Sequence, residues 1–120
     1  MKIAFDFNGV IDTFPDVLIP LMALLKHSGH QVGFCTGNKS SVFTQEFKDQ
    51  FDFTIFCDGP EEEMRLSGKV AKTHEEKMKW WKSAALKEAK VDIIFEDYAD
   101  MIEGVTAIQI GKPTKTIYEN

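Results

Sequence analysis

The chain has 120 residues, a length that predicts one domain, residues 1–120, with a sizeable core. Hydrophobic residues make up 43% of the chain and charged residues 28%, a balance that excludes a disordered protein. The formal net charge of −5 argues against a nucleic-acid partner held by long-range attraction. No apolar run reaches membrane-spanning length and no cationic segment leads into an apolar stretch, so we expect a cytoplasmic protein without a membrane partner.

The chain begins with an apolar run over residues 2–6 that ends in Asp6. A run of this length predicts a buried strand of a parallel sheet, and Gly9 allows a sharp turn after it. The apolar residues that follow have the spacing of one helical face: Val17, Leu18, Leu21, Leu24 and Leu25. We expect this helix to begin near Val17, because Pro20 then falls in its first turn.

A second apolar run, residues 31–35, predicts a strand that ends at Thr36. Ser40 or Ser41 then provides the cap of a helix that carries phenylalanines on one side. Residues 53–56 predict a third strand. The two cysteines lie in or just after apolar runs, which favours buried free thiols over a disulfide.

Residues 57–72 have no clear period and contain glycine, proline and three glutamates, so we interpret them as a long loop. Thr73 and Glu76 then form the capping-box pattern that starts a helix. Two further strands are predicted at residues 91–95 and 105–110, with a short helix between them over residues 98–103. Strands therefore alternate with helices, which predicts a doubly wound, Rossmann-like α/β fold with a five-stranded parallel sheet.

Polar residues lie where three of these strands end. Asp6 and Asn8 follow the first strand, Thr36 the second and the pair Glu96-Asp97 the fourth. We expect them in one crevice, because the carboxyl ends of parallel strands meet at one edge of the sheet. Carboxylates from two strands suit a divalent cation, most naturally Mg²⁺. A hydroxyl and a lysine, Lys72, suit the oxygens of a phosphoryl group.

These motifs resemble those of the haloacid dehalogenase-like (HAD) hydrolase superfamily, and the resemblance runs the length of the chain. The resemblance rests on four motifs, which are in chain order Asp6-Phe7-Asn8-Gly9-Val10, Gly33-Phe34-Cys35-Thr36-Gly37, a lysine that is Lys72 or alternatively Lys69, and Ile93-Ile94-Phe95-Glu96-Asp97. The acidic pair looks like that of β-phosphoglucomutase-like members. The resemblance implies the spatial strand order 5-4-1-2-3. The gaps between the motifs leave no room for a cap domain, and capless relatives act on large substrates or form oligomers.

The resemblance also implies a role for each matching residue. Asp6 would be the nucleophile that forms an aspartyl-phosphate. Mg²⁺ would be held by Asp6, by the backbone carbonyl of Asn8 and by Asp97, with or without Glu96. The phosphorylated substrate would be bound by residues after the second strand and by the motif lysine: Thr36, Gly37, Asn38 and Lys72.

Asn8 departs from the family pattern, because phosphatases of this family usually have aspartate there as the acid and base. An amide cannot exchange a proton near neutral pH. Three accounts stay open: a slow phosphatase that uses water or another residue such as Asp12, a phosphate- or nucleotide-binding relative without turnover, or an engineered replacement. We expect a magnesium-dependent phosphatase, with a phosphate-ligand or partner-binding module as the alternative.

Overall fold

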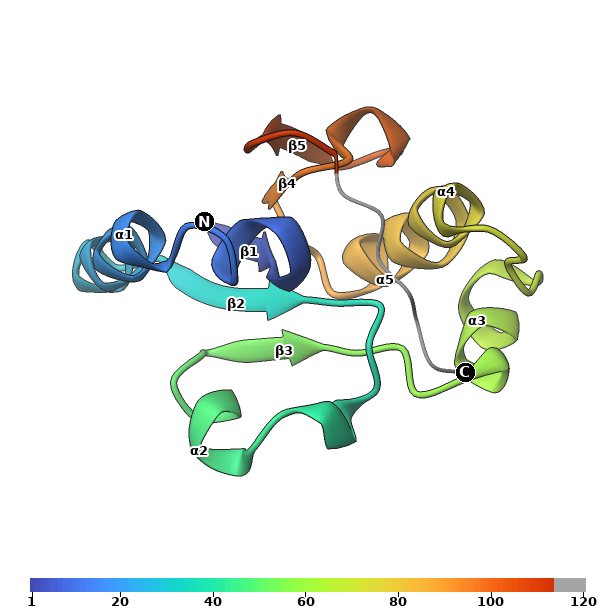
Figure 1. Cartoon of the computed structure of the whole chain (residues 1–120), viewed down its shortest axis with the longest axis horizontal. Helices are drawn as coiled ribbons and strands as arrows, with labels where there is room; N and C mark the ends of the chain where they lie inside the picture. Colours follow the sequence, from blue (N-terminus) through green and yellow to red (C-terminus); the bar gives the residue numbers. More distant parts are fainter. Residues whose placement is uncertain (114–120) are drawn as a thin grey trace.

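The computed structural model describes residues 1–113 and contains a five-stranded sheet in which every neighbouring pair of strands is parallel. The strands are β1 Lys2–Asp6, β2 Gln31–Cys35, β3 Phe53–Ile55, β4 Ile93–Glu96 and β5 Thr106–Gln109. Their order across the sheet is β3-β2-β1-β4-β5 (Figure 1). This is the predicted order read from the other edge, so the predicted fold class is confirmed, and residues 1–113 add no further domain.

The two neighbours of the central strand β1 end close to the position where β1 itself ends. Asp6 lies opposite Cys35 of β2, and Phe5 lies opposite Phe95 of β4. The next residue of β4, Glu96, therefore stands level with Asp6 at the carboxyl edge of the sheet.

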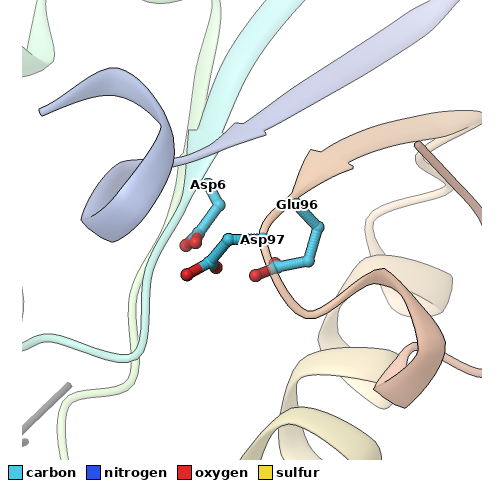
Figure 2. A group of neighbouring side chains, drawn as sticks. All are labelled: Asp6, Glu96 and Asp97. Atoms are coloured by element: carbon cyan, nitrogen blue, oxygen red, sulfur yellow. The ribbon is translucent and has the colours of Figure 1, made fainter. Parts of the chain in front are cut away.

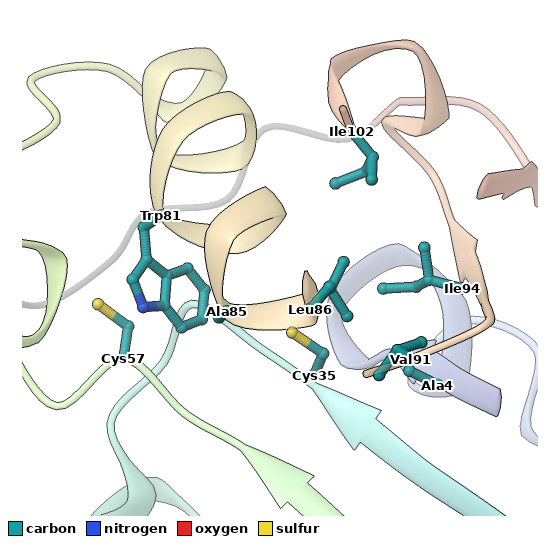
Figure 3. Close-up of a cluster of buried hydrophobic side chains, with 9 residues drawn as sticks. All are labelled: Ala4, Cys35, Cys57, Trp81, Ala85, Leu86, Val91, Ile94 and Ile102. Carbon is teal, nitrogen blue, oxygen red and sulfur yellow. The ribbon is translucent and has the colours of Figure 1, made fainter. Parts of the chain in front are cut away.

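Helices cover the two faces of the sheet, and alternate residues of β1 point to opposite layers. Ile3 and Phe5 pack in a cluster with Leu18 and Met22 of helix α1, Pro15–His27. Ala4 packs in the other cluster. Figure 3 shows Trp81, Ala85 and Leu86, from a helix over residues 74–88, against side chains of β1, β2 and β4 in that cluster.

Helix α1 begins two residues earlier than predicted. Pro15 takes the first helical position, where its fixed φ is favourable, and the carbonyl of Phe14 accepts the first bond, from Leu18 N at 3.0 Å. Pro20 consequently lies inside the helix, on its exposed side. The apolar residues that predicted this helix do not all lie on its buried face, because Val17 is 67% exposed.

The prediction of a loop over residues 57–72 is wrong, because Pro60–Ser67 forms helix α3. Proline at the first position and three glutamates in the first turn favour a helix start, since the carboxylates complement the positive end of the helix dipole. Gly68, with φ of 72°, ends the helix in the left-handed conformation. Glu63 is its one buried residue.

Two smaller predictions also need correction. The segment Ser40–Val42 is a single 3₁₀ turn, and the following helix α2, Gln45–Lys48, is capped by Thr44, whose Oγ1 accepts from Phe47 N at 3.2 Å. The short helix expected before β5 is a 3₁₀ turn, Ala99–Met101. Within residues 1–113, no helix has both the length and the apolar character that crossing a bilayer requires.

The helix over residues 74–88, here called the α4–α5 helix, changes geometry in its middle. It consists of α4 His74–Glu76, a π-helical segment Lys77–Lys82 and α5 Ser83–Glu88. The predicted cap is confirmed, because Thr73 Oγ1 accepts from Glu76 N at 3.1 Å. Ser83 N donates to Met78 O, five residues back, as a π-helix requires. Both ends of this segment, Lys77 and Lys82, are buried.

Candidate metal centre

Three carboxylates meet at the carboxyl edge of the sheet. Asp6 ends β1, Glu96 ends the adjacent strand β4, and Asp97 follows it directly. A ligand oxygen from each lies within 4.8 Å of the others, and Figure 2 shows the three side chains converging. All three residues are buried, with 5%, 0% and 2% of their surface exposed. This oxygen-rich set has the chemistry that Mg²⁺ or a similar hard cation prefers.

A buried lysine reaches the same cluster from the α4–α5 helix. Lys82 Nζ lies 2.7 Å from Asp6 Oδ1 and 2.5 Å from Glu96 Oε2, and its side chain has no exposed surface. The ammonium group therefore neutralises part of the negative charge and fixes the two carboxylates relative to each other.

The ionisation of Asp6 is perturbed by this setting. Burial is the main cause that raises the pKa of the Asp6 carboxyl well above its usual value, and the negative charge of Glu96 acts in the same direction. The neighbouring Lys82 ammonium lowers the pKa but does not outweigh burial. A divalent cation at the cluster would add positive charge and favour the ionised form.

The residues after β1 form a tight turn, Phe7–Ile11, in which Asn8 has extended backbone and Gly9 has φ of 81°. Asp12 closes the turn, because its Oδ1 accepts from Gly9 N at 2.7 Å and from Thr13 Oγ1 at 3.0 Å. Asp12 is exposed and holds the loop, which fits a turn residue better than a substitute acid.

Thr36 stands at the end of β2, directly after the residue paired with Asp6, and is fully buried. Its Oγ1 accepts from the backbone N of Asn38 at 3.2 Å and from Asn38 Nδ2 at 3.0 Å. In both of these hydrogen bonds Thr36 is the acceptor, so neither uses its hydroxyl proton. Gly37, between them, is buried.

The two lysines favoured by the sequence lie elsewhere. Lys72 is exposed, and its backbone N–H donates to Glu76 Oε1 at 3.0 Å. Lys69 Nζ lies 4.7 Å from the centre of the Trp80 ring. Within residues 1–113, neither lysine forms an ion pair with the three carboxylates. The phosphate-binding role of Lys72 stays a prediction.

Sequence reasoning missed Lys82, although a signal existed. Counting by helical spacing from Met78 puts Lys82 on the same face as the apolar residues Trp81 and Ala85. A lysine on an otherwise apolar face requires a buried partner.

His74 lies at the start of the α4–α5 helix, half-buried, with its ring centre 4.6 Å from that of Tyr98. Burial is the main cause that lowers the pKa of the His74 imidazole, and the Lys82 charge adds to it. The histidine is therefore favoured in its neutral form.

Comparisons of the chain with protein-family models, with curated proteins and with solved structures found no match. The support for a function is therefore the geometry of the site: a parallel α/β sheet that ends in a buried acidic cluster able to hold a metal ion.

Proposed function

We propose that this protein is a magnesium-dependent phosphatase or phosphoryl-transfer enzyme of the HAD-like type. The observation that carries the proposal is the convergence of Asp6, Glu96 and Asp97 from adjacent strand ends, with the buried ammonium of Lys82 among them. The acidic cluster at this edge offers a cation site, and the Thr36 hydroxyl, directly after the adjacent strand β2, can donate to an oxyanion.

The donor set fits a hard divalent cation. Asp6, Asp97 and the backbone carbonyl of Asn8 would hold it, and when bound it would neutralise phosphoryl oxygens and orient them. Glu96 has both oxygens engaged, one by Lys82 and the other by the backbone N of Tyr98 at 3.3 Å. We therefore assign Glu96 the role of positioning Lys82.

In the proposed reaction, a carboxylate oxygen of Asp6 attacks the phosphorus of a phosphate ester. The new oxygen–phosphorus bond forms as the bond to the leaving group breaks, and the leaving oxygen takes the electron pair. Water then attacks the aspartyl-phosphate at phosphorus and releases phosphate, which restores Asp6. Thr36 would donate its hydroxyl proton to a phosphoryl oxygen, with Asn38 fixing the orientation of that hydroxyl.

Asn8 limits the rate of this scheme. A carboxylate there would protonate the leaving oxygen and later activate water, and such help contributes about 10²–10⁴-fold in rate. With an amide, both proton transfers fall to water. The substrates that suit this protein best are therefore those with good leaving groups, such as acyl or aryl phosphates.

The second candidate function is a phosphate-ligand or partner-binding module on the same site, and Asn8 is the observation that favours it. Binding needs the cation ligands and the oxyanion donors, and it does not need a proton-transfer group. The absence of a cap within residues 1–113 agrees with a large phosphorylated partner as well as with a large substrate.

Pre-steady-state kinetics with an aryl phosphate and Mg²⁺ separate the two functions. We expect a burst of the aryl product followed by slow turnover, no burst in Asp6→Asn, and steady-state turnover at least about 10²-fold faster in Asn8→Asp. The gain should lie in kcat, because the added group acts on the transition state. If neither the native protein nor Asn8→Asp turns over aryl and acyl phosphates, the enzyme proposal is wrong and the binding module takes its place.

A further inference from the structure

A pocket lies on the solvent side of the α4–α5 helix, where the end of α3 approaches it. Its volume is about 410 Å³, within the range of small-molecule sites. Its lining residues are an apolar floor, a cationic rim and three further polar residues: Leu66, Trp80 and Ala84; Lys69, Lys79 and Lys87; and Ser67, Ser83 and Glu88. Lys82 of the metal centre belongs to the buried side of the same helix.

The rim carries uncompensated positive charge. Lys79 pairs with Glu103 at 3.5 Å, and the one carboxylate that lines the pocket, Glu88, is held by Arg65 at 3.0 and 3.2 Å. For Lys69 and Lys87, no carboxylate lies within 4.0 Å in residues 1–113. The Lys69 ammonium lies over the Trp80 ring and the Lys87 ammonium lies against Gly104. Two such lysines lining one pocket in a chain whose net charge is −5 favour an anionic ligand.

The floor carries an aromatic surface. Trp80 is half-buried, and Lys69 Nζ lies over its ring, 4.7 Å from the ring centre, so the Lys69 ammonium covers one face of the indole. An indole face stacks with a planar ring of any base, so a bound ring would take the place of the Lys69 ammonium on this face, and the displaced ammonium would contact an anionic group attached to the ring.

We propose that this pocket binds a small anion that combines a planar aromatic ring with a phosphate, the class represented by nucleoside monophosphates. The ring stacks on Trp80 over Leu66 and Ala84, and Lys69 and Lys87 bind the phosphate. The pocket shares no lining residue with the acidic cluster, so binding there is independent of divalent metal and of Asp6.

Titration of the full chain with AMP in EDTA, followed by tryptophan fluorescence and by calorimetry, tests the proposal. AMP should bind at one site, more tightly than adenosine or inorganic phosphate alone. Replacing both exposed lysines, Lys69→Gln with Lys87→Gln, should weaken binding about three- to tenfold, as expected for two exposed charge contacts. Trp80→Leu should weaken it about tenfold or more through lost stacking.

A matched control is Lys48→Gln, because Lys48 also lies over an aromatic ring, 5.9 Å from the centre of Phe56, but outside the pocket. It should leave AMP affinity unchanged, and so should Asp6→Asn, which separates this site from the metal centre. Unchanged affinity in the double lysine variant overturns the proposal, as does a loss of binding in Asp6→Asn. Binding of a single-stranded oligonucleotide more than about 100-fold tighter than AMP would also overturn it and would indicate a nucleic-acid surface instead.

Discussion

Replacing Lys82 by methionine removes the buried cation while keeping nearly the same side-chain length. The expected loss of stability follows from the surroundings of this side chain: Lys82 has no exposed surface and contacts Asp6 at 2.7 Å and Glu96 at 2.5 Å. Removing one partner of such a buried pair leaves uncompensated charge and destabilises by about 3–5 kcal/mol. For a domain of this size, the melting temperature should fall by about 12–20 °C.

Thermal and urea unfolding in EDTA measure this loss, and the pH dependence identifies its origin. Burial already raises the pKa of the Asp6 carboxyl above its unfolded value, and loss of the ammonium should raise it further. Such groups stabilise the fold below the unfolded pKa and lose that contribution as the pH rises through the folded pKa. The stability gap between Lys82→Met and the native protein should therefore widen from pH 5 to pH 8.

The control is Lys79→Met, three positions away on the exposed side, whose contact with Glu103 at 3.5 Å should be worth about 1 kcal/mol or less. Adding Glu96→Gln to Lys82→Met should recover part of the loss, since one unpaired charge disappears. A loss below about 1 kcal/mol for Lys82→Met, or a gap that does not change with pH, would refute the description of Lys82 as the internal counterion of the cluster.

Three further outcomes follow from the structure. Mg²⁺ should raise the melting temperature of the native protein because it binds only the folded state, and Asp97→Ala should abolish that rise; an unchanged rise would remove Asp97 from the site. Iodoacetamide at pH 8 should modify Cys35 only after unfolding, because burial raises the pKa of its thiol to about 12; rapid labelling of the native protein would contradict this. Stability should fall as the pH drops from 7.5 through the unfolded-state pKa of His74, since the unfolded chain binds that proton more readily, and denaturant titrations should show a shallower fall in His74→Gln.

The strands of this fold could be predicted because a parallel sheet buried on both faces needs continuous apolar runs. The predicted strand over residues 31–35 matches β2 residue for residue, and the apolar run that leads to Asp6 forms β1. Helix α3 was missed for the opposite reason: of its eight residues only Glu63 is buried, so almost no apolar period is present, and its signals lie in the capping residues at either end.

Part of the candidate site followed from the same logic. Strand ends that carry Asp6 and Glu96 had to meet once the strand order was fixed, and the acidic cluster lies there. Which lysine contacts the cluster could not be predicted from its distance along the chain to the acidic pair. The structure shows that Lys82 does so, because it lies on the buried face of the α4–α5 helix, next to Trp81.

The presence of Lys82 among three carboxylates has a consequence for the charge of an ion that the cluster could hold. The three ionised side chains carry three negative charges and the ammonium carries one positive charge, so a divalent ion makes the filled centre formally neutral. Neutrality matters in a buried setting, where each uncompensated charge has a large solvation penalty. A monovalent ion leaves one negative charge and a trivalent ion one positive charge. An aspartate in place of Asn8 would add a further negative charge two residues after Asp6. With a neutral asparagine at position 8, a divalent ion would balance the charge of the three carboxylates and Lys82.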